Sequence, residues 1–456
     1  MRRSPTCGKA PVPYGICSSM LKSRSVFEID LYLVISTLAL VVVGILFIFS
    51  SGVTADGQII SREYLRQIAW AGSGTVLMLL VTFIDYRSLQ RPSFLIFVLT
   101  MVVLVLTLMF GRVVNGARSW IGIGDLGGQP SEFAKLALVL ALARYFGDRP
   151  ARARSILGFA GGLGIALVPT LLVLGQPDLG SAMVYLPIFL VMAYSVGADG
   201  RYLGFLLGTG FWMVLSTVLP VWEEFLAPRP VSWIRVLSDP GPMLLLLGGL
   251  GSVMALSGLA LALTRRRLFF WFLYALSMIV VAVPAAYIAR AVLQDYQIMR
   301  LIVFVDPYVD PRGAGWNIIQ SMTAVGSGGP FGKGFLQGTQ SHYQYLPQQS
   351  TDFIFSILAE EWGFVGVLAV FSLFGVILSR GLYIMGSARD HYAALVVAGV
   401  LGMLLFHLLV NIGMAVGMMP ITGIPLFLLS YGGSSLWTAM IGIGLIMSIY
   451  QHRYQY

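Results

Sequence analysis

The sequence is poor in charge. Only 11% of its 456 residues are Asp, Glu, Lys or Arg, whereas 57% are hydrophobic. A soluble globular domain carries about 25% charged residues, and a chain of this length would need that share to cover its surface with polar groups. The composition therefore excludes a water-soluble fold and indicates a protein that is solvated by the bilayer.

Histidine and cysteine are also scarce, with four and two residues. Both cysteines, Cys7 and Cys17, lie in the polar N-terminal segment, so no disulfide framework can stabilise the body of the chain. The sequence contains no phosphate-binding loop of the Walker type, no zinc-like set of His and Cys, and no nucleophile elbow. These absences leave the polar residues within and between the apolar runs as the candidates for chemistry.

Long apolar runs account for most of the chain. Runs of roughly 17–25 apolar residues are long enough to cross a bilayer as helices. Twelve such runs predict an all-α polytopic membrane protein with about twelve transmembrane helices, near residues 29–50, 66–84, 93–110, 131–147, 153–174, 180–197, 202–221, 241–264, 268–291, 352–379, 392–417 and 424–449. The run at 131–147 is short and begins with polar residues, so we expect neighbouring helices to shelter it.

The basic residues predict the orientation. The net charge of +9 could indicate nucleic-acid binding, but cytoplasmic loops of membrane proteins collect Lys and Arg, and we therefore expect no nucleic-acid partner. Residues 1–28 are polar and basic and predict a cytoplasmic tail rather than a cleaved signal peptide. Arginines then recur in every second loop, which places both termini inside and the long stretch 292–351 outside. We expect residues 29–456 to form one membrane domain.

The first polar cluster surrounds the start of the fourth run. It comprises Arg118, Gln129, Glu132 and Lys135, of which Glu132 and Lys135 share one helix face. Charges within a membrane are costly, so the pair is either a salt bridge that lets two charges enter the bundle or a polar site in the outer leaflet, where Lys135 could face a phosphate. The turn that contains Asp178 is weak evidence by itself, because turns use these residues generally, but it falls on the same side of the membrane as this cluster, which strengthens the turn as a candidate.

Two further clusters lie near the C-terminal half. The outer stretch contains Asp310 in a Gly-rich segment, then Gln340 and Ser341, and ends near Asp352. An acidic residue in such a loop can start a turn, bind a cation or act as a general base. The last cluster contains Ser434 among glycines and prolines, a composition for which close helix packing is the favoured explanation.

Taken together, these clusters resemble the SEDS family (shape, elongation, division and sporulation). The resemblance covers about residues 29–200 and 268–450, and it is carried by GQPDLG (175–180), DPRGAGW (310–316), GTQS (338–341), TDFIFSILAEEWG (351–363) and PITGIPLFLLSYGGSS (420–435). The GTQS stretch is more similar to the RodA branch of the family than to the FtsW branch. A chance occurrence of all five motifs in this order is excluded by their number and length.

The resemblance implies a peptidoglycan glycosyltransferase of the bacterial inner membrane, which polymerises lipid II into glycan strands for cell elongation. Asp310 matches the family's essential outer-loop aspartate and is the expected catalytic residue. Glu132 and Lys135 match the QPSExxK motif. The expected substrate-binding residues are Glu132, Lys135, Arg118, Gln129, Asp178, Gln340, Ser341, Asp352 and Ser434. The implied partners are lipid II, the growing strand, membrane lipids and a class B penicillin-binding protein.

The departing diphosphate would need positive charge, from a basic side chain or from a bound divalent cation such as Mg²⁺ or Mn²⁺, for which Asp310 is the one candidate ligand.

The sequence also departs from the family in two places. The family usually has ten spans, so residues 201–264 are predicted to be an inserted hairpin, and Gln348 to Ser350 replace an acid and a histidine.

Two other functions fit many spans and buried charge. A lipid II flippase would need access from both faces of the membrane, whereas the polar motifs gather on the outer half. A non-enzymatic scaffold would leave the Glu132–Lys135 pair and the Gly-rich outer stretch unexplained.

Overall fold

The computed structural model describes residues 29–114, 116–123, 126–226, 231–293 and 295–454, so the N-terminal tail with Cys7 and Cys17 lies outside the described residues. The helices are α1 (Leu31–Ser51), α2 (Glu63–Phe83), α3 (Tyr86–Gln90), α4 (Ser93–Phe110), α5 (Pro130–Gly147), η1 (Pro150–Arg154), α6 (Ile156–Leu174), α7 (Leu179–Ser195), α8 (Gly200–Leu226), α9 (Ser232–Ser238), α10 (Pro240–Thr264), α11 (Arg267–Val292), α12 (Asp295–Val305), η2 (Pro307–Val309), α13 (Ala314–Ser327), α14 (Thr339–His342), α15 (Ile354–Gly386), α16 (His391–Ala415), α17 (Gly433–Gln451) and η3 (His452–Tyr454). The strands are β1 (Arg112–Val114), β2 (Ala117–Ile123) and β3 (Leu126–Gly128).

Each of the twelve predicted spans overlaps a helix. The last one was predicted to start too early, near residue 424, because the segment 424–432, which contains Pro425 and Gly432, forms a loop before α17. Ten helices in the described part of the chain are long and apolar enough to cross a membrane, which confirms a polytopic membrane protein. The other two are α5, which carries Glu132, Lys135 and Arg144, and α7, which has only seventeen residues. The hydrophobic runs thus indicated where helices lie. The three charged residues of α5 and the short length of α7 separate these two helices from the ten candidate membrane spans.

The helices α5, α16 and α17 form the centre of the bundle. Most side chains of each are buried, and α5 is surrounded by α4, α6, α7, α16 and α17. The predicted sheltering of residues 131–147 is therefore confirmed. Small residues allow the close packing: a Cβ atom on Gly444 of α17 would lie 2.6 Å from the carbonyl oxygen of Met78 in α2.

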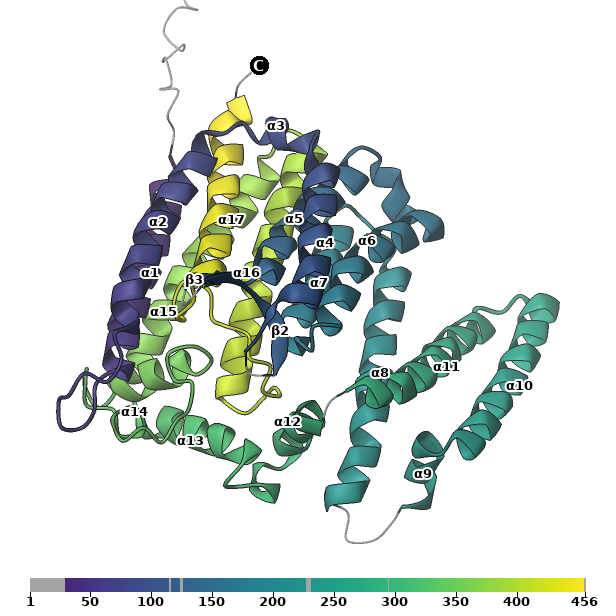
Figure 1. Ribbon diagram of the computed structural model, residues 1–456. Coiled ribbons are helices and arrows are strands. Elements are labelled where there is room, and N and C mark those ends of the chain that lie inside the picture. Colours follow the sequence, from purple (N-terminus) through teal and green to yellow (C-terminus); the bar gives the residue numbers. More distant parts are fainter. Residues whose placement is uncertain (1–28, 115, 124–125, 227–230, 294, 455–456) are drawn as a thin grey trace, which may run out of the picture.

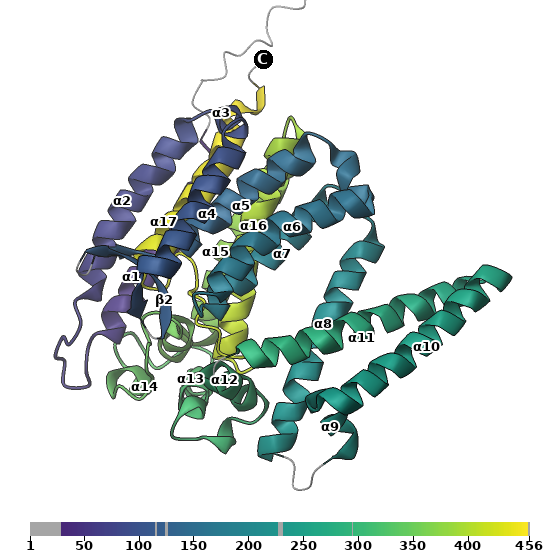
Figure 2. The same cartoon turned by 45° about the vertical axis from the view of Figure 1, so that its right-hand side comes forward.

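A peripheral group of helices projects from this bundle. Figures 1 and 2 show α8, α10 and α11 extending away from it, with α10 outermost. Helix α10 packs mainly against α9 and α11, and only Met243 and Ser257 of its side chains are buried. The segment predicted as an inserted hairpin corresponds to α8, α9 and α10, and its status as an insertion stays a prediction.

The outer stretch 292–351 is folded rather than extended. Helices α12, α13 and α14 lie within it, and α13 packs against α15 and α16. A small antiparallel sheet, in the order β1-β2-β3, lies between α4 and α5. The all-helical prediction did not include this sheet, which positions Trp120 and Gln129 for the site described next.

Candidate active site

A polar cavity of about 400 Å³ lies where five helices begin. Its wall includes Glu63 in the first turn of α2, Gln129 before α5, Leu179 at the start of α7, Asp352 before α15 and Gly432 before α17. The helices share this end because they all run in the same direction through the bundle. Their first turns and the loops that precede them therefore form one surface.

Four of the predicted site residues meet in this cavity: Gln129, Asp178, Asp352 and Ser434. The Gln129 amide group donates to Oδ2 of Asp178 at 2.7 Å, and the Gln129 backbone N–H donates to the Ser434 hydroxyl at 3.0 Å. Asp178 also caps α7 by accepting from the Ser181 N–H at 3.0 Å. The three clusters of sequence motifs thus form one hydrogen-bonded wall.

Asp352 is a half-buried carboxylic acid on the opposite part of the wall. Burial raises its pKa to about 6, and this increase is opposed by the positive charge of Arg300 and by a hydrogen bond from Thr351. The Asn411 amide group fixes the backbone here by donating to the Asp352 carbonyl oxygen at 2.9 Å and to that of Ile424 at 2.8 Å. Asp352 can therefore gain or lose a proton near neutral pH.

Helix α12 contributes three cavity residues that the sequence analysis did not select: Tyr296, Gln297 and Arg300. The Tyr296 hydroxyl donates to the Pro177 carbonyl oxygen at 2.9 Å, which ties α12 to the turn before α7. The Arg300 guanidinium lies over the Tyr296 ring, 5.4 Å from its centroid. These three residues of α12 all line the cavity. The sequence around them shows no charge pattern that would have identified them as site residues rather than the polar end of a helix.

Glu132 and Lys135 lie deeper, buried within the bundle. The Lys135 ammonium donates to Glu132 at 2.6 Å and lies 3.1 Å from Nε2 of His407, whose Nδ1 lies 2.9 Å from the carbonyl oxygen of Pro425 in the cavity wall. Of the two interpretations left open for the pair, the structure shows the salt bridge. Neither side chain lines the cavity, although His407 connects them to its wall.

Gln340 and Ser341 belong to a second buried polar network. Their segment wraps around the adjacent acids of α15, where Glu360 accepts from Lys333 at 2.7 Å and from the Gln340 N–H at 3.2 Å. Glu361 accepts from the Ser50 hydroxyl at 2.5 Å, which joins α15 to α1. This network holds the stretch 292–351 against the bundle. Gln340 and Ser341, which were predicted to bind substrate, do not line the cavity.

Asp310 and Arg118 complete the predicted set. Asp310 is half-buried between η2 and α13, where its Oδ1 accepts from the Gly313 N–H at 3.0 Å, and it does not line the cavity. Arg118 is an exposed residue of β2 whose backbone N–H donates to the Gln176 carbonyl oxygen at 3.1 Å. Asp310 lies five residues beyond the end of α12, after η2, and the same helix α12 carries Arg300 in the cavity wall.

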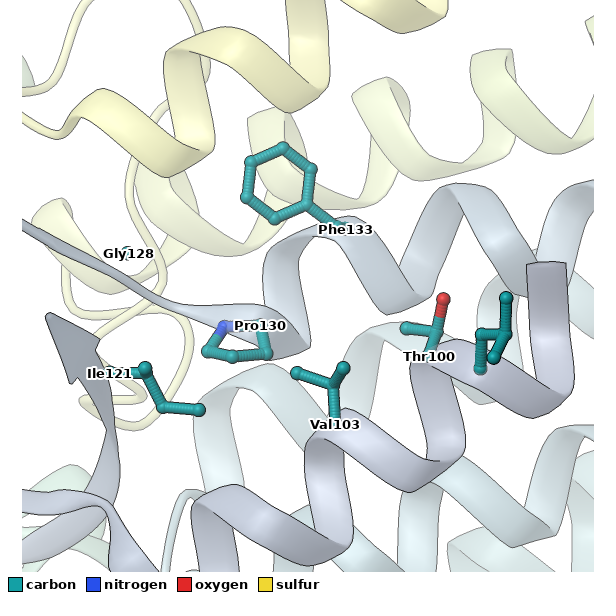
Figure 3. Close-up of a pocket in the computed structure, with 7 residues that line it drawn as sticks. Thr100, Val103, Ile121, Gly128, Pro130 and Phe133 are labelled. Carbon is teal, nitrogen blue, oxygen red and sulfur yellow. The ribbon is translucent and has the colours of Figure 1, made fainter.

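An apolar groove of about 390 Å³ adjoins the polar cavity. Figure 3 shows Val103 and Thr100 of α4 facing Pro130 and Phe133 of α5, with Ile121 of the sheet at one end. The two spaces share the junction of β3 and α5, because Gly128 lines the groove and Gln129 lines the cavity. A ligand with a polar head and an apolar tail matches this pair of sites.

No group of three or more His, Cys, Asp and Glu side chains is placed to hold a metal ion among the residues that the structure describes.

The sequence matches the model of the FtsW, RodA and SpoVE cell cycle protein family over residues 31–242 and 230–455. The chain belongs to this family. It is 50% identical over 433 residues to peptidoglycan glycosyltransferase RodA of Treponema pallidum, a match that covers 94% of this chain and 99% of the relative. It is 33% identical over 426 residues to peptidoglycan glycosyltransferase MrdB of Escherichia coli K12, with 93% and 94% coverage.

A solved structure supports the family fold. It is described as the structural coordination of polymerization and crosslinking by a peptidoglycan synthase complex, and one of its chains superposes with a TM-score of 0.64 at 30% identity. The match covers 94% of this chain and all of the other. The two chains therefore share a fold over most of the length of this chain.

Proposed function

We propose that the protein is a peptidoglycan glycosyltransferase that polymerises lipid II into glycan strands for cell elongation and rod shape, with release of undecaprenyl diphosphate. The observation that carries this proposal is the polar cavity next to an apolar groove, in a family whose relatives are named peptidoglycan glycosyltransferases. The cavity suits the sugar and diphosphate of a lipid-linked substrate, and the groove suits its tail. Polymer formation from lipid II by the purified chain tests the proposal.

In the proposed reaction, the 4-hydroxyl of one sugar attacks the anomeric carbon of another. The bond from that carbon to the diphosphate oxygen breaks, and the hydroxyl proton passes to a general base. Asp310 is the proposed base, at the start of α13. Gln129, Asp178, Asp352 and Ser434 are proposed to contact substrate directly, since they line the cavity.

The other predicted residues are proposed to support substrate binding from a distance. Glu132 and Lys135 act on the cavity through His407 and Pro425, and Gln340 and Ser341 help to hold the outer stretch. Arg118 is an exposed residue of β2, the central strand of the sheet, which also carries Trp120 into the cavity wall.

We further propose that the protein lies in the bacterial inner membrane with both termini in the cytoplasm and the cavity on the extracytoplasmic side, where lipid II is used. A class B penicillin-binding protein is the proposed partner. The similarity to a chain of a peptidoglycan synthase complex and the alternation of basic loops support this arrangement.

Blocking the apolar groove is expected to weaken substrate binding. Val103→Trp should raise the KM for lipid II by about tenfold with a smaller change in kcat, because the indole would occupy space proposed for the tail. Val105→Trp is the matched control, since Val103 and Val105 lie on the same helix and are 39% and 40% exposed, and only Val103 lines the groove. Steady-state polymerisation with varied lipid II measures both variants; an equal KM in the two would contradict the role of the groove.

The titration of Asp352 is expected to appear in substrate binding. Below its pKa of about 6 the group is neutral, and above it the carboxylate repels a diphosphate in the same cavity. The KM for lipid II should therefore rise as the pH increases through about 6, and Asp352→Asn should remove this rise. Polymerisation kinetics between pH 5 and 8 measure the effect. Persistence of the same rise in the Asn variant would assign it to another group.

A further inference from the structure

The electrostatic field of the cavity favours an anion. The amino ends of α2, α5, α7, α15 and α17 all lie at its wall, and each contributes a partial positive charge from unpaired N–H groups. Helices α5, α15 and α17 begin without a side chain that caps them, whereas α7 is capped by Asp178. The first turn of α17 is the most available, because Gly432, Ser434 and Ser435 all line the cavity.

A buried hydroxyl at the same place lacks a partner. Thr422 is 7% exposed, it lines the cavity, and among the described residues its Oγ1 takes part in no hydrogen bond. A buried hydroxyl without a partner costs free energy, so such groups are usually satisfied by protein, water or ligand. Gly423 follows with a φ of +72°, and a Cβ atom there would lie 3.7 Å from Oδ2 of Asp352 and 4.0 Å from the Arg300 guanidinium. The acid and the arginine therefore lie beside Gly423, the residue that follows the threonine in the cavity wall.

Arg300 is the only basic side chain in the wall of the cavity, as far as the described residues go. Its guanidinium makes no hydrogen bond or ion pair with any of them; it lies over the Tyr296 ring, and its charge acts on Asp352. The Tyr296 hydroxyl is bonded to Pro177, so the ring forms a fixed support. Arginine donates from a planar fork that matches phosphate oxygens.

The acids of the cavity do not cancel this field. Both carboxylate oxygens of Asp178 already accept hydrogen bonds, from Ser181 and Gln129. The raised pKa of Asp352 lets this group take up a proton when a second anion arrives. Glu63 lies in the first turn of α2, where the helix dipole compensates its charge.

We propose that Arg300, the Thr422 hydroxyl and the amino end of α17 bind the diphosphate of the lipid-linked donor and of the leaving group. This inference rests on the proposed function. The adjoining apolar groove selects a lipid anion over a free one, because the groove and the cavity meet at Gly128 and Gln129. Breaking of the anomeric C–O bond leaves the new charge on the diphosphate oxygen, beside the arginine.

Equilibrium binding of farnesyl diphosphate to the detergent-purified full chain tests this site without requiring turnover. Arg300→Gln should weaken binding by at least about tenfold and Thr422→Val by about threefold, since charge-assisted hydrogen bonds are the stronger ones. The affinity of Arg300→Lys should lie between that of Arg300→Gln and that of the wild type. Arg62→Gln is the control, because Arg62 is an exposed arginine that precedes Glu63 and does not itself line the cavity. The affinity of this variant for farnesyl diphosphate should stay within about twofold of the wild-type value.

The competitors identify the ligand. Inorganic pyrophosphate should compete weakly because it lacks a tail, and phosphatidylglycerol should compete poorly because it carries one phosphate. Equal affinity of the wild type and Arg300→Gln, or displacement by phosphatidylglycerol as readily as by farnesyl diphosphate, would overturn the proposal. If Arg300→Gln does not fold, Arg300→Lys and Thr422→Val decide in the same assay. A wild type that binds the probe but makes no polymer supports the anion site and contradicts the proposed function.

Discussion

Replacing Asp310 with alanine is expected to lower the rate of lipid II polymerisation by at least about 100-fold, the usual contribution of a general base. The carboxylate is held in place by the Gly313 N–H, and a Cβ atom at position 313 would lie within 2.1 Å of its Oδ2, so this approach requires glycine. Asp310→Asn keeps the shape and loses the base, and it should be as inactive as the alanine variant. Gel analysis of polymer from purified protein measures both.

Asp306→Asn is the matched control for this prediction. Asp306 lies four residues earlier in the same segment, is also half-buried, and also accepts from a backbone N–H, that of Tyr308 at 2.9 Å. We expect it to retain activity within about threefold, because an amide oxygen can still accept that bond. Full activity in Asp310→Asn would show that the base lies elsewhere, and Asp352 in the cavity would be the next candidate.

The position of Asp310 adds a requirement to the mechanism. Since it does not line the cavity, the acceptor sugar must extend from the cavity wall to the start of α13. Helix α12 connects the two places, with Arg300 facing the cavity and Asp310 five residues beyond its last residue. The donor diphosphate and the proposed base would then be placed by one short helix.

Removing one charge of the Glu132–Lys135 pair is expected to be strongly destabilising. Both side chains are almost fully buried, at 3% and 1% exposure, and Lys135→Met would leave the Glu132 carboxylate in the bundle with no opposing charge. Breaking a buried pair in this way typically costs about 3–5 kcal/mol of the free energy of unfolding. The double variant Glu132→Gln, Lys135→Met should recover much of the loss, because neither charge then remains. Denaturant unfolding in detergent measures all three proteins.

An exposed ion pair provides the control. Arg201 and Asp199 are 58% and 36% exposed with 3.5 Å between their charged atoms, so Arg201→Met should cost less than about 1 kcal/mol. If Lys135→Met were as stable as Arg201→Met, the buried pair would not hold α5 in the bundle. If the double variant recovered stability but not polymerisation, the pair would also be required through His407 for the shape of the cavity.

Hydrophobic run length located a helix within each of the twelve predicted spans, since a bilayer imposes a minimum length on each. It did not separate the loop 424–432 from the last helix, because that loop is also mostly apolar. The strands of the β1-β2-β3 sheet were missed because β1 and β3 have only three residues each, and because the seven residues of β2 lie in a Gly-rich segment without a regular alternation of polar and apolar residues. Helices α12 and α13 were missed because the stretch as a whole was rich in Gly, Pro and Ser. Their positions depend on tertiary contacts, of α12 with α8 and α13 and of α13 with α15 and α16.

The candidate site was predicted only in part, because some of its residues belong to recognisable motifs and others are brought to the cavity only by the fold. Gln129, Asp178, Asp352 and Ser434 belong to distinctive motifs, and the structure brings them together. Arg300 stands between apolar residues without a charged neighbour, so only the fold reveals that it faces these four. The role of Glu360 and Glu361 also depends on the fold, because their partners come from α1 and from residues 333–342.

The most direct test of the central claim is polymerisation of lipid II by the purified wild-type chain, alone and with the proposed partner, a class B penicillin-binding protein made unable to transfer glycans. The account predicts long glycan strands and release of undecaprenyl diphosphate from the wild type or from its complex. Well-folded preparations that make no strands, but move lipid II across vesicle membranes, would contradict the account and identify a flippase instead.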